Sequence, residues 1–183
     1  VQETALRFSS DPAAGKLCDF YRDVRAGLGY QKTPAEYGAF PTDPYSHTPK
    51  GRGARQPGMT GMVKEEILTR QLEVGVRFEA GRLVFDPYLL DSSELLSSPR
   101  SFAYVDVAGE EQTLSLPAGT LTSFVCQIPV VVRFGDRDEI EIHNADGTSS
   151  KVSGLWLDEE NSQHIFLRDG VVKHLLVTFS GRV

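Results

Sequence analysis

Strand-like patterning begins at the stretch Gly75-Val-Arg-Phe-Glu-Ala-Gly-Arg-Leu-Val-Phe-Asp-Pro87. Two short runs rich in β-branched and aromatic residues, Val76–Glu79 and Leu83–Asp86, flank the pair Ala80-Gly81. Such a pair between two strand-like runs predicts a β-hairpin. Because the patterning before Gly75 is helical, we expect a chain of two parts, residues 1–76 and residues 77–183.

Short strands are predicted throughout the second part. They are Phe102–Val107, Gln112–Leu116, Leu121–Gln127, Val130–Phe134, Glu139–His143, Gly154–Leu157, His164–Leu167 and Val171–Phe179. Turn-forming residues separate them every ~8–12 residues, which is typical of an antiparallel β-sandwich of jelly-roll type. The run Glu139–His143 alternates polar and apolar residues, so one face of its sheet should be solvated. The predicted fold class is therefore mainly β with N-terminal helices.

Helices are predicted in the first part. Pro12 suits the first position of a helix over residues 12–29, and a second helix should run from near Thr60 to about Val74. Residues 30–58 contain too many prolines and glycines for regular structure. A long loop this rich in aromatic residues is expected to be ordered and functional.

Composition narrows the possible partners. The net charge is −6, and residues 77–183 hold nine Lys and Arg against sixteen Asp and Glu, which argues against nucleic acid. No apolar run approaches the ~20 residues that span a bilayer, so no membrane partner is expected. Cys18 and Cys126 share no motif and are interpreted as buried thiols, which favours a cytoplasmic compartment. The start of the sequence looks like the interior of a longer chain, or like a processed or trimmed start.

A family resemblance rests on several short motifs. Gly58-Met-Thr-Gly61, the helix after it and the stretch 75–87 resemble the junction in the cellobiose- and chitobiose-phosphorylase-type glycoside hydrolases, which are (α/α)6-barrel enzymes. The pieces Ile142–Gly147, Val152–Asp158 and Ile165–Gly170 look like the end of their C-terminal β-domain. Ala145 stands where that family usually has proline, and the helix before Arg77 is about two residues longer, so a related (α/α)6-barrel group is the closer comparison.

The resemblance implies a fold and a function. Residues 1–76 would supply the closing helices and active-site loop of an (α/α)6 barrel, and residues 77–183 a bracing β-sandwich. The chain would be the C-terminal portion of a glycoside hydrolase or glycoside phosphorylase acting on oligosaccharides. Its general acid would lie outside this chain, in a barrel region that is its partner, either upstream in the same protein or in a companion chain. Two alternatives stay open: a non-catalytic carbohydrate-binding β-sandwich module, and a purely structural domain.

The loop before the second helix is the predicted substrate site. Sugar binding needs flat aromatic surfaces and planar polar groups. The candidates for substrate binding are Tyr37, Phe40, Tyr45, His47, Arg52, Arg55 and Gln56. Asp43 and Glu36 are the loop's carboxylates and the candidates for a catalytic base, since inverting glycosidases pair an acid with a base. The alternative is a Pro-rich loop packed for stability, with both carboxylates merely solvated.

Thr60 and Gly61 are a candidate phosphate site, because the start of a helix offers free N–H groups to an anion. A plain N-cap explains the same pair. Inorganic phosphate would then be a co-substrate; no other cofactor is expected. His143, His164 and His174 show no metal-ligand spacing, so no metal is expected. Trp156 is interpreted as a core residue rather than a sugar-binding platform.

Overall fold

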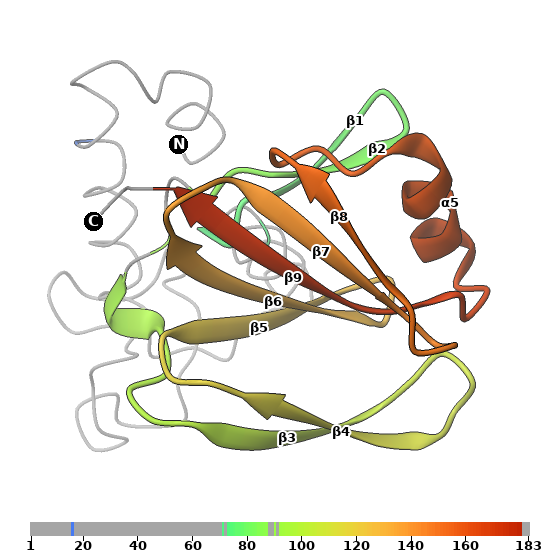
Figure 1. Cartoon of the computed structure of the whole chain (residues 1–183), viewed down its shortest axis with the longest axis horizontal. Coiled ribbons are helices and arrows are strands. Elements are labelled where there is room, and N and C mark those ends of the chain that lie inside the picture. The colour runs from blue at the N-terminus through green and yellow to red at the C-terminus, as the bar shows by residue number, and fades with distance from the viewer. Residues whose placement is uncertain (1–15, 17–70, 72, 88–89, 91, 181–183) are drawn as a thin grey trace, which may run out of the picture. The chain divides into compact units, whose positions relative to one another are not determined.

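The computed structural model describes residues 16, 71, 73–87, 90 and 92–180 (Figure 1). The predicted helices over residues 12–29 and 60–74, the loop between them and the closing segment of a barrel lie outside the described residues, except for residues 16, 71, 73 and 74, of which 16, 71 and 73 are helical. The described residues from Val74 onwards belong to one compact unit, Val74–Val183. The boundary between residues 76 and 77 stays a prediction.

Strands dominate the described part of the chain. They are β1 (Val76–Glu79), β2 (Arg82–Phe85), β3 (Arg100–Val105), β4 (Glu111–Leu116), β5 (Thr120–Val125), β6 (Ile128–Gly135), β7 (Glu139–Asn144), β8 (Ser149–Ser153) and β9 (Val172–Ser180). One α-helix, α5 (Glu159–Leu167), and one short 3-10 helix, η1 (Ser92–Glu94), complete the elements of this part. The prediction of a mainly β fold is therefore confirmed.

The strands form two hairpins and one larger sheet. β1 pairs with β2, β3 pairs with β4, and the five-stranded sheet has the order β5-β6-β9-β7-β8. The hairpin predicted around Ala80-Gly81 is confirmed, since both residues have the positive φ values that a tight primed turn requires.

The expectation of a purely antiparallel sheet is wrong. β6 and β9 pair in parallel, with Val130 opposite Leu175 and Val132 opposite Val177. A parallel pair needs a long crossover, and here β7, β8 and α5 supply it between β6 and β9. The sheet is therefore mixed: β9 runs in the same direction as β6, while the other strand pairs of the sheet are antiparallel.

Two local predictions are also wrong. Residues His164–Leu167 belong to α5 and not to a strand. The helix begins at Glu159, because the Asp158 side chain before it accepts a hydrogen bond from the Asn161 N–H at 2.8 Å, as an N-cap residue does. Residues Gly154–Leu157 contribute an isolated β-bridge instead of a strand, and β8 lies just before them in a Ser-rich run.

The core lies on one face of the five-stranded sheet. Ile140, Ile142, Leu175 and Val177 point to this face and are essentially inaccessible to solvent. The β1–β2 hairpin and α5 add side chains to the same buried cluster, among them Leu83, Phe85 and Ile165. These elements therefore cover the inner face. The alternation predicted for Glu139–His143 is confirmed: Ile140 and Ile142 are buried, while the residues between them remain partly exposed.

Candidate functional site

The substrate loop predicted from the sequence lies outside the described residues. This applies to Glu36, Tyr37, Phe40, Asp43, Tyr45, His47, Arg52, Arg55, Gln56, Thr60 and Gly61. Their roles in catalysis, sugar binding and phosphate binding stay predictions. Cys18 also lies outside the described residues.

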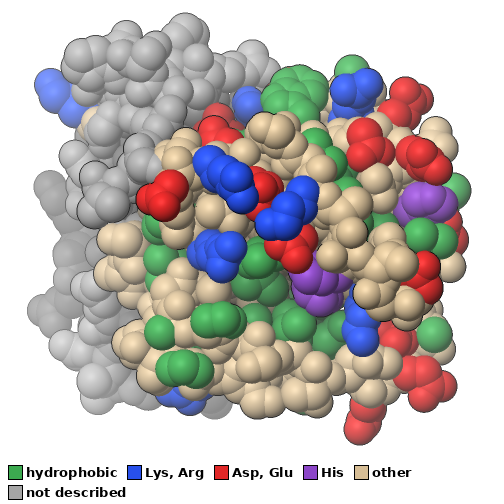
Figure 2. All heavy atoms as spheres, in the orientation of Figure 1, with side chains coloured by type: hydrophobic (Ala, Val, Ile, Leu, Met, Phe, Trp, Pro, Cys, Tyr) green, Lys and Arg blue, Asp and Glu red, His purple; other side chains and the backbone are tan. Residues whose placement is uncertain are grey.

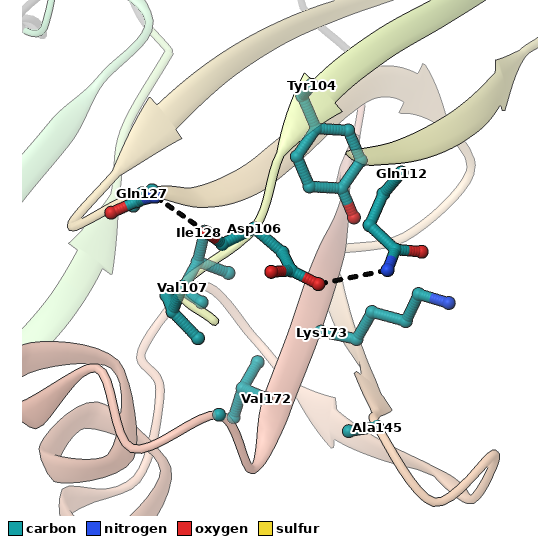
Figure 3. Close-up of a pocket in the computed structure, with 10 residues that line it drawn as sticks. Tyr104, Asp106, Val107, Gln112, Gln127, Ile128, Ala145, Val172 and Lys173 are labelled. Atoms are coloured by element: carbon teal, nitrogen blue, oxygen red, sulfur yellow. Dashed lines mark hydrogen bonds between the residues drawn. The ribbon is translucent and has the colours of Figure 1, made fainter. Parts of the chain in front are cut away.

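A small pocket in the β unit is the candidate site (Figure 3). It is formed by the β3–β4 hairpin, the turn between β5 and β6, and the start of β9. Its lining consists of Tyr104, Asp106, Val107, Gln112, Gln127, Ile128, Ala145, Gly170, Val172 and Lys173. Its volume of about 150 Å³ is well below the ~300–1,000 Å³ of pockets that enclose drug-sized ligands. It can therefore hold one small polar moiety.

Asp106 organises the loop of the β3–β4 hairpin. Its Oδ1 accepts hydrogen bonds from the backbone N–H groups of Ala108 and Glu110, and its Oδ2 accepts one from Nε2 of Gln112 at 2.9 Å. These bonds, led by the one from Glu110, hold the pKa of the Asp106 carboxyl below its usual range. The carboxylate stays ionised and serves as a fixed acceptor, not as a proton donor.

Tyr104 provides a hydroxyl at the other wall of the pocket. Its ring contacts those of Phe102 and Phe124, with centroids 6.3 and 5.9 Å away, so two aromatic side chains hold it in place. Burial, and then the negative charge of Asp106, raise the pKa of the Tyr104 phenol. The hydroxyl therefore remains protonated and can donate a hydrogen bond.

The turn between β5 and β6 fixes the position of the hairpin. Cys126 and Gln127 have φ values of 49° and 71°, a left-handed conformation that costs non-glycine residues about 1–2 kcal/mol each. Nε2 of Gln127 donates a hydrogen bond to the Asp106 carbonyl oxygen at 2.7 Å. Cys126 is exposed, so its interpretation as a buried thiol is wrong. Cys126 lies in the tight turn between β5 and β6, where its side chain points to solvent and not into the core.

Lys173 and Gln112 complete the polar side of the pocket. Figure 3 shows the Tyr104 hydroxyl, the Asp106 carboxylate and the Gln112 amide turned toward one another, with the Lys173 side chain running beside them. Val107, Ile128 and Val172 provide an apolar wall opposite. The pocket thus combines hydrogen-bond donors and acceptors, one positive and one negative charge, and an apolar surface.

The outer face of the five-stranded sheet carries paired charges. Nζ of Lys151 lies 2.8 Å from Glu139 and 3.2 Å from Glu141, and Arg137 lies 3.1 Å from Glu139. In Figure 2, Lys and Arg side chains lie beside Asp and Glu side chains, with a histidine next to them. The hydrogen bond between Lys151 and Glu139 lowers the pKa of the Glu139 carboxyl and raises the pKa of the Lys151 ammonium. The positive charges of Lys151 and Arg137 are thus paired with the carboxylates of Glu139 and Glu141.

The three histidines of the described region make structural contacts. The rings of His143 and His174 stack with centroids 4.2 Å apart. Burial, and then the nearby His143, lower the pKa of His174 to about 4. His164 lies in α5, 2.6 Å from Asp169. Within the described residues, no group of three or more His, Cys, Asp or Glu side chains could hold a metal ion.

Trp156 is exposed, with 47% of its surface accessible, so its interpretation as a core residue is wrong. Its neighbours Leu155 and Leu157 point to the opposite side, and Leu157 is fully buried. The alternation of the sequence Leu-Trp-Leu therefore directs the indole outward.

No helix in the described part of the chain is both long and apolar enough to cross a bilayer. Neither the comparison with protein-family models nor that with curated proteins finds a match for this chain.

The sequence did not predict the pocket. Its polar residues come from four separate places, the end of β3, the start of β4, the β5–β6 turn and the start of β9. Only the parallel pairing of β6 and β9 brings Lys173 near the β3–β4 hairpin. The one local signal is the run Tyr104-Val-Asp106 followed by Gln112, in which polar groups alternate with apolar ones at a hairpin end.

Proposed function

We propose that the β unit is a non-catalytic carbohydrate-binding domain that belongs to a glycoside hydrolase or glycoside phosphorylase. One observation carries this proposal: the Tyr104 hydroxyl and the Gln112 amide face the fixed carboxylate of Asp106, and Lys173 lines the same pocket (Figure 3). Sugar hydroxyls both donate and accept hydrogen bonds, and such a mixed set of planar and charged groups binds them in pairs.

The charges favour an uncharged sugar. Asp106 and Lys173 bring one negative and one positive charge to the pocket, so the two nearly cancel. A ligand carboxylate or phosphate entering it would meet the ionised Asp106, whose pKa is held low. The apolar side chains of Val107 and Val172 can contact the C–H groups of a sugar ring.

Glycan-array screening of the full chain, followed by calorimetry on the best ligand, tests the proposal. Lys173→Met should weaken binding about tenfold or more, because a hydrogen bond to a charged group contributes about 1.5–3 kcal/mol. Lys151→Met is the matched control: it removes an ammonium from the outer face of the same sheet and should leave affinity unchanged. Equal effects of the two variants, or no glycan ligand at all, would favour the purely structural alternative.

The catalytic part of the proposal rests on the resemblance of the sequence motifs. The loop over residues 36–58 would line the sugar site of the barrel, with Asp43 or Glu36 as the base. Its test needs the full-length enzyme: Asp43→Ala and Arg55→Ala should each lower turnover of the accepted glycoside. Unchanged turnover in both variants would contradict the assignment of the loop, whatever the β unit binds.

A further inference from the structure

The floor of the pocket beside Tyr104 and Asp106 is part of the hydrophobic core. Ile128 and Val172 line this pocket, yet only 3% and 2% of their surfaces are exposed. Both belong to the buried cluster that contains Leu175 of the five-stranded sheet. Because the floor is continuous with the core, a ligand enters the pocket from the solvent side and cannot pass through it.

Backbone hydrogen bonds fix two opposite sides of the pocket. The loop after β3 is held by the two backbone N–H groups that donate to Oδ1 of Asp106. In the turn between β7 and β8, the Ala145 N–H donates to the Val171 carbonyl at 3.0 Å, which ties this turn to the start of β9. Figure 3 shows Tyr104 and Ala145 on opposite sides of the cavity. The pocket is therefore walled by segments that are each hydrogen-bonded in place.

A β-bulge places Lys173 at the rim of the pocket. In the pairing of β7 with β9, His143 lies opposite His174. The next residue of β7, Asn144, lies opposite Val172, so Lys173 is the extra residue of β9. Bulges of this kind change the direction of a side chain in a strand. Lys173 is exposed and lines the pocket, so it stands where a bound ligand meets solvent.

The volume of the pocket limits the ligand to one ring. It measures about 150 Å³, and an apolar cavity of about that volume in another protein binds a single benzene molecule. A pyranose ring with its hydroxyl groups is no smaller than benzene, so the pocket accepts one sugar ring at most. A second, linked residue would lie outside, beside Ala145 and Lys173 at the rim.

We propose that this pocket recognises the terminal residue of a neutral glycan and not a residue within the chain. An internal residue carries glycosidic bonds at two positions and needs two exits, whereas an end residue needs only one. The closed floor and the fixed sides leave the mouth of the pocket as the exit. The hydroxyl groups that an end residue keeps free fit the Tyr104 hydroxyl, the Asp106 carboxylate and the Gln112 amide. This inference rests on the proposed function and specifies its substrate class.

NMR chemical-shift titration of the full chain tests the inference. The probes are glucose with cellohexaose and maltohexaose, mannose with mannohexaose, and xylose with xylohexaose. For at least one sugar we expect the monosaccharide and its hexasaccharide to bind with affinities within about threefold, because each presents one ring to the pocket. The backbone amide signals of Asp106, Gln127 and Lys173 should shift with both ligands, which locates binding at this pocket and not at the loop over residues 36–58.

Two matched variants complete the test. Ala145→Leu adds bulk at the exposed rim and should weaken the binding of both ligands about tenfold or more. Ala108→Leu adds the same bulk to an exposed position of the β3–β4 loop that does not line the pocket, and should leave affinity unchanged.

The outcomes distinguish this inference from the proposed function. A hexasaccharide that binds about tenfold or more tightly than its monosaccharide would overturn end recognition, because several sugar residues would then contact the protein, while carbohydrate binding itself would stand. Undiminished binding in Ala145→Leu would overturn it as well. If no probe shifts the pocket signals, the proposed function fails and end recognition fails with it.

Discussion

Nε2 of Gln127 lies 2.7 Å from the carbonyl oxygen of Asp106 and donates a hydrogen bond to it across 21 residues of sequence. Gln127 makes this bond from a left-handed backbone conformation, with φ at 71°. Strained backbone of this kind persists only where surrounding contacts hold it. The bond therefore links the turn between β5 and β6 to the hairpin that carries the pocket.

Two substitutions at Gln127 separate the bond from the strain. Gln127→Ala loses the hydrogen bond but keeps the unfavourable φ, and should lower the free energy of unfolding by about 1 kcal/mol. Gln127→Gly also loses the bond, but glycine adopts this φ readily, so its cost should be smaller. Chemical denaturation measures both. A larger loss for glycine than for alanine would contradict this account of the turn.

The stacked histidines predict a pH dependence of stability. The pKa of His174 is lowered to about 4 in the folded state, by burial and then by His143 and Lys173, while Glu141 opposes the shift. Near its ordinary pKa of about 6.5 the unfolded state therefore binds more protons, and stability rises with pH. The contribution is complete above about pH 6.5 and is lost as the pH falls towards about 4.

His174→Gln tests this dependence. Because the ring of His174 is only partly buried, the loss between pH 7 and pH 4 should be about 1–2 kcal/mol rather than the full value of the shift. Denaturation curves at both pH values give the difference for each protein. In His174→Gln the free energy of unfolding should change less between the two pH values. An unchanged pH dependence would show that His174 is not its source.

Gly75 and Gly81 provide a matched pair for backbone effects. Both have positive φ, at 81° and 75°, but a Cβ on Gly75 would come within 2.1 Å of the Asp86 backbone, while one on Gly81 meets nothing within 4 Å. Gly75→Ala should cost about 3 kcal/mol or more, because strain and overlap act together. Gly81→Ala should cost about 1–2 kcal/mol from strain alone. Similar thermal midpoints for the two variants would show that the close approach is not required.

Ser162 connects α5 to the β1–β2 hairpin. Its Oγ accepts a hydrogen bond from the Leu83 N–H at 3.1 Å and donates one to the Asp158 carbonyl at 2.6 Å. Ser162→Ala would leave the buried Leu83 N–H without a partner and should cost about 1–3 kcal/mol. Ser150→Ala, in the exposed edge strand β8, should stay within about 0.5 kcal/mol. Urea denaturation measures both losses of unfolding free energy. A larger loss for Ser150→Ala than for Ser162→Ala would refute this role of Ser162.

Much of the strand content could be predicted from the sequence. The β1–β2 hairpin follows from two β-branched runs around Ala80-Gly81, and β7 follows from the alternation of Glu139–His143. The helix α5 also had a signal that the strand interpretation overlooked. Asp158 before Glu159 and Glu160 is a helix start, with an N-cap followed by acidic residues in the first turn.

Other features depend on contacts that no local pattern contains. The parallel pairing of β6 with β9 joins segments separated by two strands and a helix, and it decides that the sheet is mixed. β8 is an edge strand with a single apolar residue, Val152, so hydrophobic alternation could not reveal it. The pocket depends on the same long-range pairing, which brings Lys173 beside Tyr104 and Asp106.

Carbohydrate binding by the pocket is the central claim, and Tyr104→Phe tests it most directly. This change removes one hydroxyl while the ring keeps its contacts with Phe102 and Phe124. In a calorimetric titration of the full chain with the glycan selected by array screening, we expect about five- to tenfold weaker binding and unchanged stability. Binding of equal strength in Tyr104→Phe and the unmodified chain would contradict the claim that this pocket holds the sugar.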